Sequence, residues 1–436
     1  MSVRLAWALV AAASAGTPVT AGEPVPALAE RPCPARLAVP ATCHAGRDQH
    51  GAGLLAVIPK QWNRALVVHA HGGPRLGDPE LSATEEDLVR FRAMVSAGYA
   101  WIGSTYRRGG YGVRMAAADV DESRRVFWRQ FGTPRLTVLH GQSYGGNVAA
   151  KASELYARSP TGERQFDGIL VTNGLLFGGT GAYGFRADLR AIYQYYCRNL
   201  PRPDEAQFPL WQGTSKDSPW TREEVGQRLD ECTGASRPPA QRSAGQTARL
   251  KAITGVTGIR AENLESHLEW ATFTFADLVQ TRLGGRNPFD NSRTVYRGSA
   301  DDGALNRGVA RFAADQSAVD TLAYDADLTG LIVVPTITVH YRNDPTVSAA
   351  ADGVYAAKVA AAGKAHLLVQ AIAEEGTHSR LSATDYLAPL EELAKWIEGA
   401  TRPDPAGIAA RCRQLASALD VRCSLLGRPY APPSRP

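Results

Sequence analysis

A serine stands between glycines at a point where the sequence pattern changes from strand to helix. Segment 136–140 (LTVLH) is β-branched and apolar and predicts a buried strand, whereas 147–158 has the composition of a helix. The pentapeptide GQSYG at 141–145 joins them. A sharp strand-to-helix turn leaves no room for side chains two residues before or after its apex, and it exposes the apex side chain in a strained backbone conformation. The spacing predicts that Ser143 is a nucleophile.

A serine hydroxyl needs a general base and an acid that orients the base. Groups that follow parallel strands meet at one edge of the sheet, so the partners of the serine are expected after later strands. Asp344 follows the expected strand 331–339, and His378 lies in a glycine-containing loop after the expected strand 366–372. The chain order serine, aspartate, histidine is the order expected for a nucleophile on this kind of turn. We therefore expect Ser143, Asp344 and His378 to form a catalytic triad.

Other carboxylates compete with Asp344 for the role of the acid. The candidates are Asp301, Asp302, Asp325, Asp327 and Glu375. The first two lie inside an expected insertion, and the next two precede their strand rather than follow it. Position at the end of a strand favours Asp344.

The sequence HGGP at 71–74 follows another expected strand and suggests an oxyanion hole. Gly72 and Gly73 offer backbone N–H groups that no side chain obstructs, and the N–H of Tyr144, directly after the nucleophile, is the expected second donor. Alternatively, His69 and His71 face the same side of a strand and could bind a metal. No third ligand follows at a recognisable spacing, so we expect no metal, and the triad chemistry requires no cofactor.

Strands and helices alternate along most of the chain, which predicts an α/β fold with a doubly wound, mostly parallel sheet. The expected strands are 54–58, 65–71, 99–105, 136–140, 166–172, 331–339 and 366–372, and the main helices are 84–97, 115–130, 147–158, 350–362, 386–397 and 408–419. Between 177 and 325 no comparable strand occurs, and this stretch is too long for a loop. It predicts an inserted, mainly helical cap, with GGTG at 178–181 as the hinge. The expected divisions are a signal peptide (1–21), an N-terminal segment (22–53), the core (54–176 and 326–400), the cap (177–325) and a tail (401–436).

With these motifs the chain resembles the α/β-hydrolases over about residues 54–397. The resemblance implies a serine hydrolase with an inserted cap. GQSYGG at 141–146 and YRRGGYG at 106–112 are also similar to the catalytic domain of prolyl-oligopeptidase-type peptidases. Those peptidases carry a long N-terminal propeller, whereas only residues 1–53 precede the expected core here. The resemblance therefore implies serine hydrolase chemistry firmly and peptidase specificity only weakly.

The start of the chain and its cysteines predict export to the periplasm or the medium. Arg4, the short apolar run 5–15 and a small-residue site at 19–21 are typical of a secretory signal, with the mature chain beginning near Gly22. The six cysteines fall into local pairs, which predict disulfides Cys33–Cys43, Cys197–Cys232 and Cys412–Cys423, although fifteen connectivities are possible.

Composition and charge argue against several partners. The net charge of +5 over 436 residues contains no dense basic run, and no later segment is long and apolar enough to span a membrane. We expect neither nucleic acid binding nor membrane insertion after signal removal. The sequence does not specify an oligomeric state.

These observations favour an exported serine hydrolase acting on small or oligomeric carboxylic esters. Aromatic residues of the expected cap are candidates for the substrate pocket or for the cap's own core: Tyr193, Tyr195, Tyr196, Trp211, Trp220, Trp270, Phe273 and Phe275. Two alternatives stay open. One is an exported peptidase, in which Asp204, Glu205 or Glu269 would bind a free amino terminus. The other is a non-catalytic binding protein on a hydrolase scaffold.

Overall fold

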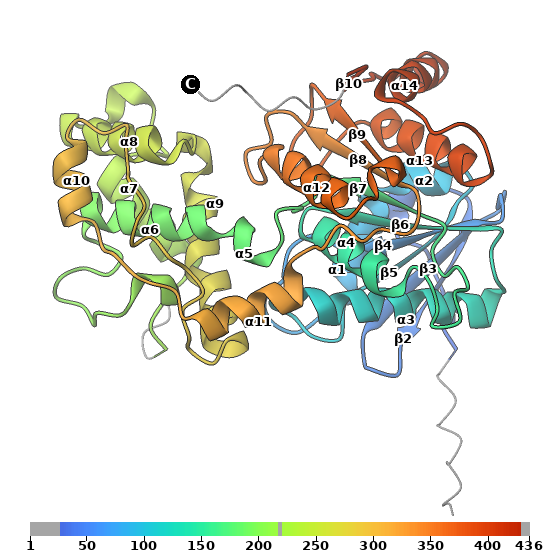
Figure 1. The fold of residues 1–436 in the computed structure, drawn as a ribbon, viewed down its shortest axis with the longest axis horizontal. Coiled ribbons are helices and arrows are strands. Elements are labelled where there is room, and N and C mark those ends of the chain that lie inside the picture. The colour runs from blue at the N-terminus through green and yellow to red at the C-terminus, as the bar shows by residue number, and fades with distance from the viewer. Residues whose placement is uncertain (1–26, 217–219, 429–436) are drawn as a thin grey trace, which may run out of the picture.

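The protein has two parts, a sheet domain and a helical lobe, which lie side by side in the computed structural model (Figure 1). The structure describes residues 27–216 and 220–428. The expected signal peptide, 1–21, and its cleavage site lie outside the described residues.

One ten-stranded sheet forms the sheet domain, in the order β1-β2-β3-β5-β4-β6-β7-β8-β9-β10. The six central strands are parallel: β4 (Ala65–Ala70), β5 (Ala100–Ser104), β6 (Leu136–Gln142), β7 (Gly168–Thr172), β8 (Thr336–Tyr341) and β9 (Leu368–Ala373). The outer strands are antiparallel: β1 (Ala29–Arg31), β2 (Ala41–Arg47), β3 (Gly53–Pro59) and β10 (Leu425–Leu426). This arrangement confirms the predicted α/β fold with a doubly wound, mostly parallel sheet.

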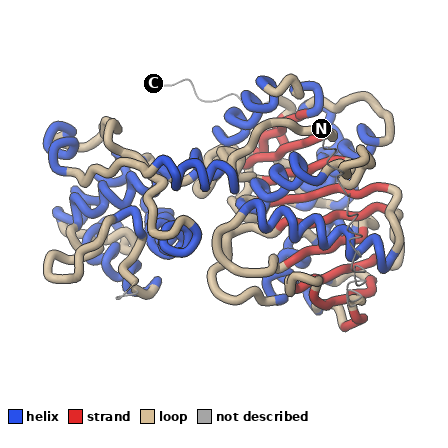
Figure 2. Tube along the Cα trace, turned by 60° about the horizontal axis from the view of Figure 1, so that its bottom comes forward, coloured by secondary structure: helices blue, strands red, loops and turns tan. Residues whose placement is uncertain are grey.

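Helices cover both faces of the sheet (Figure 2). One face packs against α1 (Leu81–Arg90), α2 (Arg92–Ser96), α13 (Ala383–Ile397) and α14 (Pro405–Leu419), and the other against α3 (Val113–Phe131), α4 (Tyr144–Tyr156) and α12 (Ala350–Ala361). Successive strand residues face opposite sides. Leu66 and Val68 accordingly belong to the core beneath α3 and α4, whereas Val67 belongs to the core on the other face.

The structure differs from the sequence pattern at several boundaries. Strand β8 begins at Thr336, because Pro335 lacks the N–H that a sheet ladder needs, so 331–334 of the expected strand is not a strand. The expected helix 84–97 is divided at Phe91 into α1 and α2. Strands β1, β2 and β10 lie in the segments 22–53 and 401–436 and extend the sheet at its two edges.

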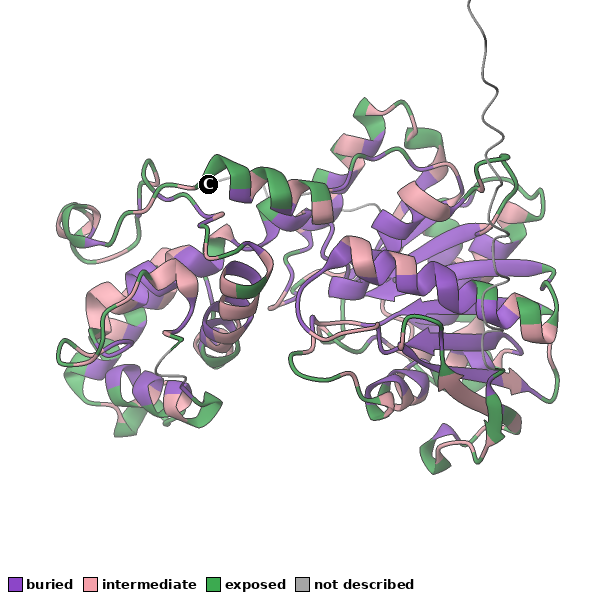
Figure 3. Ribbon diagram, turned by 90° about the horizontal axis from the view of Figure 1, so that it is seen from below, coloured by how far each residue is buried: buried purple, intermediate pink, exposed green. Residues whose placement is uncertain are grey.

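The helical lobe is formed by the chain between β7 and β8. Its helices are α5 (Gly179–Ala182), α6 (Gly184–Cys197), α7 (Arg222–Thr233), α8 (Ala244–Thr257), α9 (Leu264–Glu269), the π-helical segments Trp270–Thr274 and Ala276–Arg282, α10 (Asp302–Gly308) and α11 (Gln316–Ala326). Short 3₁₀ turns are Ala35–Leu37, Leu210–Gln212, Pro239–Gln241, Ala261–Asn263 and Ala365–Leu367. The lobe has its own buried cluster, in which Tyr193, Val225 and Ile253 meet. Figure 3 shows that both parts contain buried residues, drawn in purple.

The two crossings between sheet domain and lobe lie next to each other. Thr180 lies where the chain leaves the sheet domain, and Asp327 lies where it returns. The backbone N–H and the hydroxyl of Thr180 donate to the carboxylate of Asp327 at 2.8 and 2.6 Å. Asp325, at the end of α11, accepts from the first N–H groups of α3, those of Val113 and Arg114, at 2.9 and 3.1 Å. These contacts attach the base of the lobe to the sheet domain.

Three disulfides join sequence-local cysteines. Cys33–Cys43 connects the segment after β1 to β2, Cys197–Cys232 connects α6 to α7 in the lobe, and Cys412–Cys423 connects α14 to the segment before β10. These are the three expected pairs. Within the described residues, no helix is long and apolar enough to cross a membrane.

Candidate active site

Ser143 lies at the apex of the turn between β6 and α4. Its backbone has φ 59° and ψ −125°, a conformation that L residues rarely adopt. A Cβ at Gly141 would collide with the carbonyl oxygen of Gly145, and a Cβ at Gly145 would collide with that of Ala70. The glycines are therefore required because the strand, the helix and the end of β4 approach each other closely around the serine.

His378 connects Ser143 to Asp344. Its Nε2 lies 2.7 Å from the Ser143 Oγ, and its Nδ1 lies 2.7 and 3.0 Å from the two carboxylate oxygens of Asp344. Ser143 and His378 are partly exposed, whereas Asp344 is buried. The structure thus brings together the three residues that the sequence selected, with His378 partly accessible to solvent and Asp344 shielded from it.

The Asp344 carboxylate is held by the loop that follows it. Its Oδ1 accepts hydrogen bonds from the backbone N–H groups of Thr346 and Val347 at 2.8 and 3.0 Å. Burial would raise the pKa of Asp344, but His340 and His378 outweigh burial and hold this pKa well below its usual range. Asp344 is therefore an anion that can orient a histidine and stabilise its protonated form.

Two amides, which the sequence did not single out, hold His378 in place. Gln142 and Asn173 donate to the backbone carbonyl oxygen of His378 at 2.7 and 2.8 Å. Asn173 has a positive φ of 46° and also accepts from the N–H of Tyr341 at 2.7 Å. It links the ends of β7 and β8 to the histidine loop. Its position directly after a buried strand is the signal that could have identified it.

The loop with Gly72 and Gly73 packs against the nucleophile. A Cβ at Gly72 would lie 2.8 Å from the Oε1 of Gln142 and 3.5 Å from the Cβ of Ser143. Gly73 has φ 76°, and space around its Cα is open. Tyr144 is the first residue of α4, so its N–H cannot bond within the helix. Gly72 and Tyr144 therefore lie next to Ser143, and Gly73 follows Gly72 in the same loop.

Aromatic packing fixes the start of this loop. The Tyr106 ring stacks on His71 with centroids 4.1 Å apart, and its hydroxyl donates to the His71 carbonyl oxygen at 3.1 Å. Burial lowers the pKa of His71 to about 4, so its imidazole is neutral at neutral pH. Its Nδ1 lies 3.0 Å from the carbonyl oxygen of Gly72. His69, the other residue considered as a metal ligand, instead lies 3.0 Å from His140 through their Nδ1 atoms.

The competing carboxylates have other partners. Asp301 caps α10, and Asp302 accepts from Ser299 in the same part of the lobe. Asp325 accepts hydrogen bonds from the start of α3, and Asp327 accepts hydrogen bonds from Thr180. Glu375 forms an ion pair with Arg422 at 2.8 Å. Only Asp344 among these carboxylates is hydrogen-bonded to His378 in the described part of the chain.

The lobe contacts the loop that carries the acid. Arg186 of α6 donates from Nη2 to the carbonyl oxygen of Thr346 at 3.3 Å, and His267 of α9 lies 2.9 Å from that of Pro345. Arg186 also donates to the Nδ1 of His267 at 3.2 Å. Burial, with Arg186 beside it, lowers the pKa of His267 to about 4, so the ring is neutral and accepts this bond. The lobe therefore supports the same loop that holds Asp344.

A series of aromatic rings runs from the nucleophile turn into the lobe. Tyr144 packs edge-on to Tyr111, Tyr111 packs edge-on to Tyr183, and Tyr183 stacks on Trp270 with centroids 4.5 Å apart. Trp270 and Phe275 join the core beneath α3 and α4, whereas Tyr193 and Trp220 belong to the lobe's own cluster. The aromatic residues of the lobe are thus divided between the core of the sheet domain and the lobe's own core.

A cavity near the site begins at the loop that contains His71 and Pro74. It has a volume of about 290 Å³ and is lined by His71, Pro74, Tyr106 and Arg108, among others. A second cavity of about 1000 Å³ shares Arg108 and continues to the lobe at Asp277 and Arg282. A cavity of about 1170 Å³ lies among α1, α2, α13 and α14. None of Ser143, Asp344 and His378 lines any of these three cavities.

Known proteins resemble this chain in structure and not in sequence. No protein-family model matches the chain, and a search of curated proteins finds no similar sequence. Among solved structures, the chain is similar to a membrane phospholipase A, a bacterial virulence factor, with 13% identity and a TM-score of 0.38 over 83% of this chain and 87% of that chain.

Two further structures are similar to the same extent. The rice cell wall degrading esterase LipA from Xanthomonas oryzae has 14% identity and a TM-score of 0.38, covering 82% of this chain and 89% of that chain. Acylaminoacyl peptidase from Pyrococcus horikoshii has 11% identity and a TM-score of 0.38, covering 83% of this chain and 42% of that chain. Similarity at this level does not transfer an activity, so the function has to follow from the site itself.

Proposed function

We propose that the protein is an exported serine hydrolase that cleaves carboxylic esters through an acyl-enzyme intermediate. The observation that carries this proposal is the position of His378, with Nε2 at 2.7 Å from the Ser143 hydroxyl and Nδ1 at 2.7 Å from Asp344. This is the connection that converts a serine hydroxyl into a nucleophile. The leader-like start of the sequence and the three disulfides support export.

In the proposed reaction, Ser143 attacks the carbonyl carbon of the ester while its proton passes to Nε2 of His378. Asp344 keeps the Nδ1–H of His378 pointing away from the serine and stabilises the imidazolium that forms. The N–H groups of Tyr144 and Gly73 stabilise the oxyanion of the tetrahedral intermediate. His378 then donates its proton to the leaving alcohol. Water, activated by the same histidine, attacks the acyl-enzyme and releases the acid.

The lobe gives less support to the peptidase alternative. Glu205 pairs with Arg228 at 2.7 Å and Glu269 pairs with Arg222 at 2.5 Å, so both candidate carboxylates already have cationic partners. Asp204 is exposed. A site for a free amino terminus needs an available, shielded carboxylate, so esters are the favoured substrates.

A covalent probe tests the proposed nucleophile. A fluorophosphonate is expected to label the mature protein at Ser143, and Ser143→Ala is expected to lose both labelling and turnover of p-nitrophenyl esters. Ser266→Ala, at an exposed lobe serine, is the matched control and is expected to keep both. Labelling that persists in Ser143→Ala would contradict the assignment, and an unlabelled, inactive wild type would favour the binding-protein alternative.

A paired substrate series distinguishes esterase from peptidase. We expect kcat/KM for p-nitrophenyl esters to exceed that for aminoacyl-nitroanilides of the same acyl size. The reverse order would identify a peptidase with the same triad.

A further inference from the structure

A second histidine lies behind the acid of the triad. His340, near the end of β8, is completely buried, and its Nε2 lies 3.6 Å from the Oδ2 of Asp344. On its other side, its Nδ1 lies 2.5 Å from the Oδ2 of Asp352 in α12. The imidazole of His340 is thus enclosed between two carboxylates, one of which faces the catalytic base.

Both ring nitrogens of His340 face hydrogen-bond acceptors. The Nε2 lies 3.0 Å from the carbonyl oxygen of Val347, which can only accept. Asp352 accepts the hydroxyl of Thr338 and the amide of Gln370 on its Oδ1, so its Oδ2 is left to accept from the Nδ1–H of His340. For both nitrogens to donate, His340 must carry both protons and therefore a positive charge.

The charges around this ring favour the protonated form. Asp352 faces it from α12 and Asp344 from the following loop, whereas Thr338 of β8 and Gln370 of β9 contribute only dipoles. Burial alone would lower the pKa of His340, but the two carboxylates outweigh burial and raise it to about 10. On the lobe side, Arg186 contacts the carbonyl oxygen of Thr346, two residues beyond Asp344.

We propose that His340 is a permanently protonated positioning residue, which Asp352 holds in place and which offsets part of the negative charge that Asp344 presents to His378. This inference rests on the proposed function, because it describes how the acid of the triad is tuned. His340 touches neither substrate nor the reacting atoms. It acts through Asp344 and through the loop carbonyl of Val347.

Removing this charge is expected to change the pH dependence of activity, whereas the loss of a packing contact alone would not. Without the imidazolium, Asp344 attracts a proton on His378 more strongly. The base is then blocked by protonation at a higher pH. From Coulomb's law at the effective dielectric constant of a protein interior, the acid limb of the kcat/KM profile is expected to move up by roughly 0.5–1.5 pH units.

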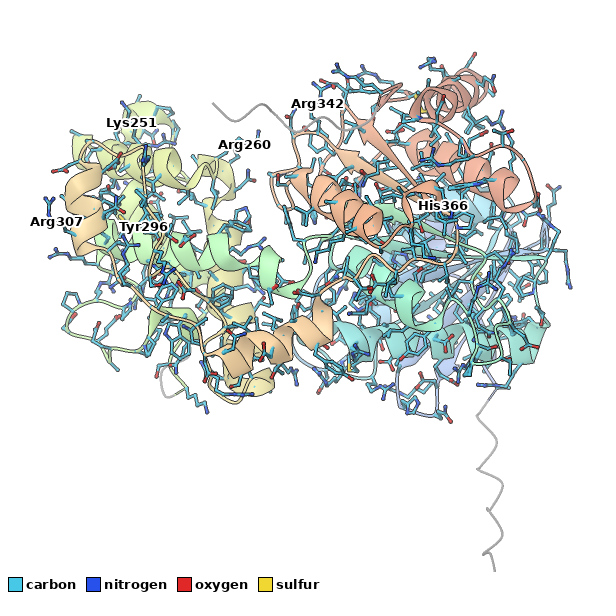
Figure 4. All side chains as sticks on the ribbon, in the orientation of Figure 1. Lys251, Arg260, Tyr296, Arg307, Arg342 and His366 are labelled. Carbon is cyan, nitrogen blue, oxygen red and sulfur yellow. A yellow bond between two sulfur atoms is a disulfide. The ribbon has the colours of Figure 1, made fainter. Side chains whose placement is uncertain are left out.

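The first test follows this limb in ester hydrolysis. His340→Gln, which keeps a hydrogen-bonding side chain without the charge, is expected to shift the acid limb to higher pH relative to the wild type. The control is His366→Gln at an exposed histidine of the sheet domain (Figure 4) and is expected to leave the limb in place. A His340→Gln variant with lower kcat but an unmoved limb would show a structural role only and would overturn the proposal.

The second test measures protonation directly and requires no turnover. In ¹⁵N-histidine-labelled protein, the resonance that disappears in His340→Gln is expected to show two protonated nitrogens from pH 6 to pH 9. Asp352→Asn is expected to remove this property near neutral pH. A neutral His340 ring at pH 8 in the wild type would overturn the proposal. A doubly protonated ring in a protein that neither labels nor hydrolyses esters would instead leave the charge intact and overturn the proposed function.

Discussion

Arg186 of the helical lobe donates a hydrogen bond to the carbonyl oxygen of Thr346, two residues beyond Asp344, across the boundary between the two parts of the molecule. The guanidinium is buried, which lowers its pKa to about 10, and it stacks at 4.7 Å from the centroid of Trp270. Within the described residues, it forms no ion pair with a carboxylate. A buried cation whose donors reach a neutral histidine and a loop carbonyl serves to hold that loop.

We therefore expect Arg186→Met to misplace Asp344 while the apolar stem keeps much of the packing. The predicted effect is a fall of about 10- to 100-fold in kcat for a p-nitrophenyl ester, with a smaller change in KM. Steady-state kinetics check this, with far-ultraviolet circular dichroism to confirm folding. Arg307→Met, on the exposed surface of the lobe (Figure 4), serves as the control. Unchanged kcat in a folded Arg186→Met protein would show that the lobe does not support the triad.

The identity of the acid predicts a contrast between two regions. Asp344→Asn keeps the shape but presents an N–H to His378, which favours the wrong tautomer, and in chymotrypsin-like serine proteases the corresponding change costs about 10⁴ in turnover. We expect a loss of roughly 10²- to 10⁴-fold in kcat near neutral pH. Asp301→Asn and Asp302→Asn, which remove charges at the start of α10 in the lobe, are expected to stay within about tenfold of the wild type. Collapse of activity in a lobe variant alone would move the acid into the lobe.

The perturbed histidines predict how stability depends on pH. His71 and His267 have a pKa near 4 in the folded protein, whereas an unfolded histidine titrates near about 6.5. Between these values the unfolded chain binds more protons, so the free energy of unfolding falls as the pH drops from about 6.5 towards 4. The pKa of His340 is raised to about 10, so its effect has the opposite sign. Its contribution to the free energy of unfolding is complete below about pH 6.5 and is lost as the pH rises towards 10.

Urea unfolding at several pH values checks both slopes. We expect the free energy of unfolding to be greatest near pH 6.5. His267→Gln is expected to flatten the acid side by up to roughly 3 kcal/mol, and His340→Gln to flatten the alkaline side. His366→Gln, at an exposed site, is expected to change neither slope. Parallel profiles in all four proteins would show that these histidines do not titrate as the structure indicates.

The triad was predictable from the sequence because each of its members lies next to a strong local signal. Ser143 lies between glycines that the turn requires, and Asp344 and His378 each follow an apolar strand. A parallel sheet converts these three positions into one place in space. Gln142 and Asn173 were not predicted, because nothing local reveals that two amides converge on the carbonyl of His378.

Contacts between distant elements account for most of what the sequence could not show. Strand β2, with the sequence ATCHAGR, has little apolar character of its own and is a strand because it pairs with β3. The charge on His340 depends on Asp352, a residue of the following helix, and the support of Asp344 by Arg186 depends on how the lobe folds back. Each of these features depends on contacts made in the tertiary fold, and the residue pattern of a single strand or helix does not reveal such contacts.

The adjacency of Thr180 and Asp327 bears on how such a protein can change over evolutionary time. An insertion whose two ends lie next to each other does not disturb the sheet, because β7 and β8 can pair in the same register whatever segment connects them. Recombination could then replace the whole lobe in one event and give the same catalytic turn a new substrate range. A foreign lobe would arrive without Arg186 and His267, however. Specificity could be inherited in a single step, whereas efficiency would have to be regained by selection at the few positions that touch the loop of Asp344.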